Sequence, residues 1–262
     1  MIPILFRIGP LEIPSYGVCL ALGILLAWFF FNRQFKTAAN KDELASLITY
    51  AVVAGFLGSR LNYILEHTED IGSWSDLFHM IFSRSGLTVY GGLIAGVLFA
   101  IFYCRKHEIA VLPVLDAGAP AICIGYFFGR LGCQLSGDGD YGKPSTLPWA
   151  MAYPNGTVPT LERVHPAPVY EMILYAVIFC ILLWYRRKKP APGKVFSLFL
   201  ILAGLERFGI EWIRLNRPVF LGLTEAQLVS VAVAIMGVIL FLKLPSAVES
   251  PQSKRIRAGT AG

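Results

Sequence analysis

The chain has 262 residues, of which 55% are hydrophobic and only 15% are charged. A water-soluble domain averages about 25% charged residues because its surface faces water, so this composition excludes an ordinary soluble domain. The formal net charge of +6 sits in short basic runs beside apolar segments. No long basic run or basic–aromatic stripe suggests nucleic acid as a partner.

Seven apolar segments follow one another along the chain. A helix that crosses the hydrocarbon layer needs about 20 mostly apolar residues. The segments cover residues 15–32, 43–65, 87–104, 116–134, 168–185, 194–213 and 225–243. Glycine, proline and arginine interrupt the fourth segment, so we predict a broken helix there. The predicted fold class is all-α integral membrane, with about seven transmembrane helices and an irregular extracytoplasmic loop region.

Two longer polar stretches, 66–86 and 135–167, separate these spans, and the second is rich in Gly, Pro, Tyr and Trp. That composition predicts irregular structure at the outer membrane surface. We predict a single transmembrane domain over residues 1–245 and a polar, disordered tail over 246–262. The N-terminus lacks the basic start and small-residue cleavage site of a signal peptide, so we expect the first span to be retained.

The distribution of lysine and arginine predicts the orientation in the membrane. Fourteen of these residues follow the odd-numbered spans, whereas six lie in the segments on the opposite side. The positive-inside rule makes the richer side cytoplasmic. The N-terminus and both longer loops are then extracytoplasmic, and the C-terminus is cytoplasmic.

The five cysteines form neither a CxxC motif nor a Cys/His cluster with metal-ligand spacing. We therefore predict no metal site. Most of them fall inside apolar segments, where a cysteine usually acts as a small packing residue. They are Cys19, Cys104, Cys123, Cys133 and Cys180.

Charged residues within the spans are candidates for function, because each costs about 2.5–3.5 kcal/mol on insertion scales. Arg207, Glu211 and Arg214 have the spacing of one helix face, so an intrahelical ion pair is one interpretation. Anion binding is the other, because a guanidinium group fits the phosphate oxygens that lipid headgroups supply. Apart from the first and last residue of each span, the charged residues within the spans are Arg60, Arg130, Glu171, Glu206, Arg207 and Glu211.

The segment Gly125–Gly142 contains six glycines in eighteen residues, together with Arg130, Asp138 and Asp140. Glycine lets the backbone turn tightly and approach a ligand closely. A glycine-rich helix-packing surface followed by a polar turn is the alternative interpretation. Helix packing does not explain the arginine, so the composition favours a binding site.

Two further clusters combine glycine, tyrosine or histidine near the ends of spans. Tyr90, Gly91 and Gly92 open the third span, where the glycines also permit close helix contact. Tyr90 and Tyr16 lie at similar depth and can offer a hydroxyl to a headgroup, or serve as interfacial anchors. His165 precedes the fifth span and is a candidate general base or a structural loop residue.

These clusters, in this order, resemble the bacterial prolipoprotein diacylglyceryl transferase family over residues 8–242. The similarity rests on SYG at 15–17, GSRLNY at 58–63, YGGLIAG at 90–96, GRLG at 129–132, DGDYG at 138–142, HPAPVYE at 165–171 and ERFGIEWIR at 206–214. Members of this family move the diacylglyceryl group of phosphatidylglycerol onto the lipobox cysteine of a preprolipoprotein signal peptide. A thioether forms and glycerol phosphate leaves.

The resemblance implies a multi-pass enzyme of the bacterial inner membrane that uses no metal and no organic cofactor. It makes Arg130 the phosphatidylglycerol-binding arginine and Arg207 the second essential arginine. With Tyr16 and Tyr90 these form the predicted catalytic set. The predicted substrate-binding set is Arg130, Arg207, Arg60, Gly91, Gly92, Asp138, Gly142, His165, Glu171, Glu206 and Glu211.

The chain departs from the family pattern at two positions. Tyr90 stands where the family commonly has histidine, and Cys133 where it commonly has asparagine. A tyrosine, with a pKa of about 10, is a poor base at neutral pH. A substrate thiol can instead ionise beside Arg130 and Arg207. Alternative functions are a related transferase with a different acceptor, a membrane transporter that uses the buried charges, and a lipid-binding scaffold.

Overall fold

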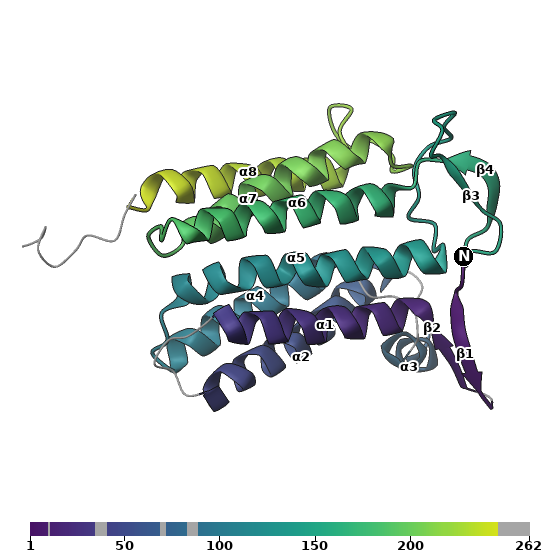
Figure 1. Cartoon of the computed structure of the whole chain (residues 1–262). Coiled ribbons are helices and arrows are strands. Elements are labelled where there is room, and N and C mark those ends of the chain that lie inside the picture. Colours follow the sequence, from purple (N-terminus) through teal and green to yellow (C-terminus); the bar gives the residue numbers. More distant parts are fainter. Residues whose placement is uncertain (10, 35–40, 69–71, 83–88, 246–262) are drawn as a thin grey trace, which may run out of the picture. The chain divides into compact units, whose positions relative to one another are not determined.

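The computed structural model describes residues 1–9, 11–34, 41–68, 72–82 and 89–245 (Figure 1). Long helices coincide with all seven predicted spans. In chain order, the elements are β1 (Ile4–Ile8), β2 (Leu11–Pro14), α1 (Ser15–Gln34), α2 (Lys41–Glu66), α3 (Trp74–Phe82), α4 (Val89–Lys106), α5 (Val111–Ser136), β3 (Met151–Tyr153), β4 (Thr160–Val164), α6 (Ala167–Arg187), α7 (Lys194–Ile210), the short 3-10 helix η2 (Glu211–Ile213) and α8 (Glu225–Lys243).

Five helices within the described residues are long and apolar enough to cross a membrane: α1, the Ser46–Glu66 part of α2, α5, α6 and α8. The chain is therefore a mainly helical, multi-pass membrane protein. α4 and α7 occupy the positions of the third and sixth predicted spans and are not among these five. The count of seven crossings stays a prediction, and the predicted tail at 246–262 lies outside the described residues.

Two expectations about irregular structure are wrong. α5 continues through Pro120 to Ser136 without a break, because neighbouring groups in a membrane helix can satisfy the carbonyl that proline leaves without a donor. The 135–167 segment contains an antiparallel hairpin, β3–β4, in which Met151 pairs with Val164. A turn rich in Pro, Asn and Gly connects its strands. A second hairpin, β1–β2, precedes α1 and was not predicted.

The chain divides into two compact units, and the smaller consists of Lys36–Val111. In this small unit, α2 packs closely on α4. A Cβ placed on Gly58 would lie 2.7 Å from the carbonyl oxygen of Gly91, so only a residue without a side chain fits there. α3 lies near α2, and Arg60 Nη1 donates to the carbonyl oxygen of Met80 on α3 over 3.0 Å.

The large unit consists of Met1–Phe35 and Leu112–Gly262. Within it, α6, α7 and α8 lie side by side (Figure 1). The carboxylate of Asp116 on α5 accepts hydrogen bonds from the backbone N–H groups of Gly193 and Phe196, each over 2.7 Å, and so fastens the start of α7. The buried core that joins α5, α6 and α7 consists of Ala119, Cys123, Tyr175, Ile178, Leu182, Val195, Phe199 and Leu200.

Candidate functional site

Arg130 lies near the end of α5, with its side chain only 13% exposed. All three of its guanidinium nitrogens meet protein groups. Nε pairs with Glu171 on α6, Nη1 pairs with Asp140 in the loop after α5, and Nη2 donates to the hydroxyl of Tyr126 over 3.0 Å. The Tyr126 hydroxyl in turn donates to Glu171 over 3.1 Å. Arg130 is thus held in a fixed orientation from three directions.

Arg214 meets the same two carboxylates from the other side. Its Nη2 lies 2.5 Å from Asp140 Oδ1, and its Nη1 lies 3.3 Å from Glu171 Oε1. Two arginines and two carboxylates therefore alternate around a ring whose formal charges cancel. We call Arg130, Asp140, Glu171 and Arg214 the ring. Glu171 is fully buried, and such a carboxylate is stable only where cations and hydrogen-bond donors surround it.

Arg207 forms a second ion pair one turn before the end of α7. Its Nη1 lies 2.9 Å from Glu211 Oε2, so the predicted intrahelical ion pair is present. The expectation that Arg214 shares this helix face is wrong, because α7 ends at Ile210 and the backbone is extended at Arg214. The other Glu211 oxygen accepts from Thr224 Oγ1 over 2.8 Å and from Asn216 Nδ2 over 2.6 Å.

Glu206 is the exception among these buried charges. Its residue is 7% exposed, and neither carboxyl oxygen has a hydrogen-bond partner among the described residues. It interacts electrostatically with Glu171, Arg207, Arg130 and Arg214. Glu206 is therefore buried within electrostatic range of Arg207 and of the two arginines of the ring.

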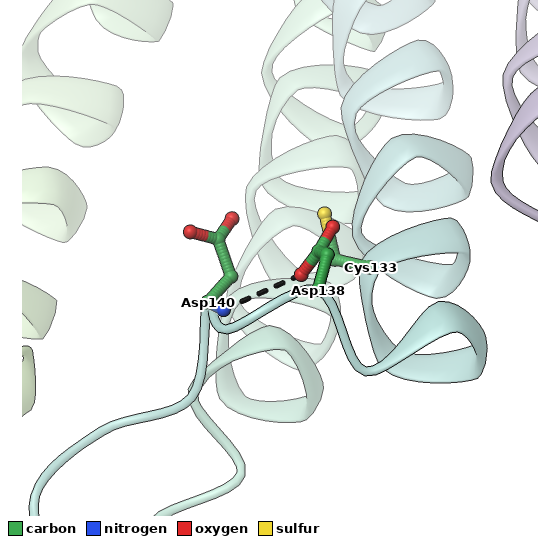
Figure 2. Close-up of side chains that lie close together, drawn as sticks. All are labelled: Cys133, Asp138 and Asp140. Carbon is green, nitrogen blue, oxygen red and sulfur yellow. Dashed lines mark hydrogen bonds between the residues drawn. The ribbon is translucent and has the colours of Figure 1, made fainter. Parts of the chain in front are cut away.

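The loop after α5 brings Asp138 and Asp140 beside Cys133 (Figure 2). Burial, and then the neighbouring Asp140 carboxylate, raise the pKa of Asp138 above its usual range. Burial would also raise the pKa of Asp140, but the guanidinium groups of Arg130 and Arg214 outweigh it and lower that pKa. The two carboxyl groups therefore differ in their affinity for a proton, as acid and base partners in enzymes often do.

The ligand atoms of Cys133, Asp138 and Asp140 lie within 4.8 Å of one another, a grouping that no CxxC or Cys/His motif in the sequence reveals. The arrangement suits a metal ion poorly. Both oxygens of Asp140 face guanidinium groups, and the two positive charges of Arg130 and Arg214 would repel a cation. The expected absence of a metal stays a prediction.

Three further predicted residues lie in the large unit. Tyr16, at the start of α1, interacts electrostatically with Cys133 and Asp138, so it lies on the same side of the unit as the ring. Gly142 packs so closely that a Cβ would lie 2.5 Å from the Ile213 carbonyl oxygen. His165 Nδ1 lies 3.3 Å from the Tyr170 hydroxyl, which also accepts a hydrogen bond from a tryptophan in the 145–150 loop. These contacts are those of a structural loop residue.

The remaining predicted residues, Arg60, Tyr90, Gly91 and Gly92, lie in the small unit. Arg60 is 8% exposed and bonds within that unit. The side chain of Tyr90 lies outside the described residues. Gly91 and Gly92 face the backbone of α2, as the helix-packing interpretation expects. A binding role for these four residues stays a prediction.

Sequence reasoning missed Tyr126 and the contact between Arg214 and Asp140. Tyr126 precedes Arg130 by four residues, and this i, i+4 spacing on a helix could have identified it. Arg214 and Asp140 were noted as charges, but no local pattern pairs residues 74 positions apart.

Comparison with known proteins covers nearly the whole chain. The family model for prolipoprotein diacylglyceryl transferase matches residues 3–243. The chain is 32% identical to the phosphatidylglycerol–prolipoprotein diacylglyceryl transferase of Clostridium tetani, over 92% of this chain and 97% of that protein. It is 34% identical to the enzyme of the same name from Methylococcus capsulatus, over 91% and 93% of the two chains. The family resemblance is confirmed on both counts, and the chain belongs to the prolipoprotein diacylglyceryl transferase family.

Proposed function

We propose that this chain transfers the diacylglyceryl group of phosphatidylglycerol to the lipobox cysteine thiol of a preprolipoprotein, the first step of lipoprotein maturation. One observation carries the proposal beyond family membership. Arg130 and Arg207 are held by carboxylates at the ends of two helices of one membrane-embedded unit. Fixed guanidinium groups at the edge of an apolar bundle suit the phosphate of a lipid headgroup.

The partners of Arg130 define how a phosphate would reach it. Each of its three nitrogens has a partner and two of these partners are carboxylates, so a lipid phosphate that binds Arg130 is proposed to take the place of one carboxylate. Asp140 has a side chain 33% exposed, whereas Glu171 is fully buried. Asp140 also follows two glycines with positive φ, Gly137 at +60° and Gly139 at +95°. Asp140 is therefore the group that yields to the phosphate.

The chemical step exchanges one bond for another. The substrate sulfur attacks the glycerol carbon as a thiolate, the C–S bond forms, and the C–O bond to phosphate breaks. The electron pair leaves with glycerol phosphate, whose charge Arg130 and Arg207 stabilise. The guanidinium groups also favour ionisation of the thiol.

The thiol proton needs an acceptor, and we assign this role to Asp138. It lies beside Cys133 at the same end of α5 as Arg130, and its raised pKa makes it a better base than an ordinary aspartate. Tyr16 and Tyr90 orient the lipid or the thiol through their hydroxyl groups. A substrate-binding role for Arg60, Gly91 and Gly92, within the small unit, is part of the same proposal.

The proposal places the chain in the bacterial inner membrane with seven crossings. The excess of basic residues after the odd-numbered spans puts the N-terminus outside and the C-terminus in the cytoplasm. The ends of α5 and α7 then open toward the extracytoplasmic face, where a secreted preprolipoprotein presents its signal peptide.

Thioether formation in a reconstituted membrane tests the proposal. The full chain is placed in vesicles that contain phosphatidylglycerol, and a lipobox peptide is added. We expect product with the unaltered chain and a loss of more than about 100-fold with Arg130→Ala or Arg207→Ala. Arg7→Ala, at an exposed ion pair with Glu12, is the matched control. Normal thioether formation by Arg130→Ala would contradict the assignment.

A related transferase with a different acceptor is the second candidate, and the observation that favours it is Cys133, buried beside Asp138 where the family commonly has asparagine. Rescue of a strain that lacks its own transferase separates the two. The standard reaction predicts rescue, whereas a changed acceptor predicts lipid binding without rescue. Tyr90→His and Tyr90→Phe, tested alongside, show whether the Tyr90 hydroxyl takes part in proton transfer.

A further inference from the structure

The loop between η2 and α8 ends in a tight hairpin with an apolar surface. Val219 N–H donates to the Leu223 carbonyl over 2.8 Å, and Leu223 N–H donates to the Phe220 carbonyl over 2.8 Å. Val219, Phe220 and Leu221 are 72%, 61% and 83% exposed. Three consecutive large apolar side chains therefore point away from the protein. We call residues 217–222 the tip.

The backbone of the tip makes this exposure costly. Leu221 has φ +50° and Gly222 has φ +75°, the left-handed pair of a type I′ turn. Asn, Asp or Gly is favoured at the first of these positions, because a larger side chain crowds the backbone there. Leucine at this site is unfavourable both for the turn and for solvation in water. Both costs are explained if the Leu221 side chain contacts something other than this protein or water.

Hydrogen bonds and an ion pair hold the base of the loop, so the position of the tip is fixed relative to α7 and α8. Glu211 accepts hydrogen bonds from Thr224 and Asn216 and thereby holds the two ends of the loop together. We call residues 211–216 and Thr224 the neck. Arg214 joins the same neck to the ring through Asp140. In Figure 1 the loop projects between the end of α7 and the start of α8.

The surface next to the tip identifies its partner. α8 begins at Glu225, two residues after the hairpin, and is long and apolar enough to cross a membrane. Its Val229 and Ile235 are exposed, so an apolar, lipid-facing helix begins directly after the tip. Arg217 at the start of the tip is also exposed and can meet anionic headgroups.

We propose that the 217–222 tip inserts into the headgroup layer of the bilayer beside α8 and anchors the α7–α8 end of the protein to anionic lipid. Val219, Phe220 and Leu221 enter the apolar boundary, and Arg217 contacts phosphate. Because the neck also holds Glu211 and Arg214, the anchor sets the depth of both arginine clusters relative to the lipid phosphates.

Depth-dependent quenching of a fluorophore tests the anchor without any catalytic readout. Leu221→Cys is labelled in a Cys180→Ser background, since Cys180 is the exposed cysteine and the other four are buried. Asn155→Cys, on the exposed turn between β3 and β4, is the polar control. The full chain is placed in phosphatidylcholine vesicles with and without phosphatidylserine, an anionic lipid that is not the proposed substrate.

We expect the label at 221 to be quenched by headgroup spin labels and shielded from iodide, more so with phosphatidylserine, and the label at 155 to stay open to iodide. Equal iodide access at both positions would overturn the proposal. Shielding that appears only when a lipobox peptide is added would also overturn it, because the tip would then bind the peptide rather than the membrane.

Leu221→Asn keeps the experiment interpretable, because asparagine suits the positive φ and the variant should fold at least as well as the unaltered chain. With a label at Val219→Cys, Leu221→Asn should lose the shielding from iodide. If the transferase reaction holds, the variant should also raise the apparent KM for lipid in vesicles about fivefold with kcat unchanged. Leu161→Asn, at a leucine 85% exposed on β4, should do neither. Retained shielding in Leu221→Asn would reject the anchor whatever the activity.

Discussion

Arg214 Nη2 lies 2.5 Å from Asp140 Oδ1, although 74 residues separate them in the chain. The pair joins the segment after α7 to the loop after α5 and completes the ring that also contains Arg130 and Glu171. A second tie lies beside it, because Lys143 N–H donates to the Ile213 carbonyl over 2.7 Å. These contacts fix the loop that supplies Asp140 and Asp138.

Arg214 is therefore expected to be a positioning residue of the site. Arg214→Lys keeps the charge but loses the planar fork that meets Asp140 and Glu171 together. We expect transfer activity to fall about 10–100-fold, with a lower melting temperature in detergent. Arg7→Lys, in an exposed pair with Glu12, should change neither quantity. Unchanged activity of Arg214→Lys would show that the fork is not needed.

Asp138 and Asp140 are expected to affect stability in opposite directions. The pKa of Asp140 is lowered in the folded protein, so its contribution to stability is present above the unfolded value of about 3.9 and is lost as the pH falls. The pKa of Asp138 is raised, so its favourable contribution is present at low pH and is lost as the pH rises through the folded value.

At neutral pH, Asp140→Asn should therefore lower the melting temperature, by an amount equivalent to about 1–3 kcal/mol for the lost charged hydrogen bonds. Asp138→Asn should leave the melting temperature unchanged or raise it. Thermal unfolding from pH 8 to below pH 4 checks both: the advantage of Asp138→Asn should shrink as the pH falls, whereas the deficit of Asp140→Asn should persist at about pH 4 and shrink only below the unfolded pKa of about 3.9. A lower melting temperature for Asp138→Asn at pH 8 would contradict this assignment.

Glu171 and Glu206 are both buried, but only Glu171 has hydrogen-bond and ion-pair partners among the described residues. Glu171 bonds to two arginines and Tyr126, so Glu171→Met should cost about 3–5 kcal/mol, because it leaves buried cations without a partner. Glu206 has no hydrogen-bond partner among the described residues, so Glu206→Met should be neutral or stabilising. Thermal unfolding measures both. Loss of activity in a more stable Glu206→Met protein would mark Glu206 as a functional group.

Asp116 anchors the first turn of α7 through two backbone N–H groups. Asp116→Ala leaves these donors without their partner and should lower stability by about 1–3 kcal/mol. The affinity for lipid should not change in the folded fraction, because Asp116 lies at the end of α5 opposite the ring. Unfolding in detergent checks the first statement, and a KM for lipid that rises with Asp116→Ala would argue against the second.

Gly58 is expected to be irreplaceable within the small unit. A Cβ there would lie 2.7 Å from the Gly91 carbonyl oxygen, so Gly58→Ala forces α2 and α4 apart and should cost about 1–3 kcal/mol. Gly125→Ala is the control, since no described atom outside its own helix backbone lies within 4 Å of its Cβ position. Similar melting temperatures for the two variants would show that α2 and α4 can separate without cost.

Local patterns in the sequence predicted the membrane class, the positions of the long helices and the charges buried within them. Hydropathy and helical spacing are properties of one segment, so Arg130, Glu171, Arg207 and Glu211 could be found without knowledge of packing. The same reasoning failed for α5, because a neighbouring group can satisfy a carbonyl that Pro120 leaves without a donor. It also missed the β3–β4 hairpin, whose strands are only three and five residues long.

Tertiary structure alone decided which charges meet. The sequence allowed Arg214 to share a face with Arg207, but α7 ends before it, and Arg214 turns to Asp140 and Glu171 instead. Only packing shows that each guanidinium nitrogen of Arg130 has a partner while Glu206 lacks a hydrogen-bond partner among the described residues. The physical reason is that the energy of a buried charge depends on the groups brought within a few ångströms of it, and segments distant in the chain supply those groups.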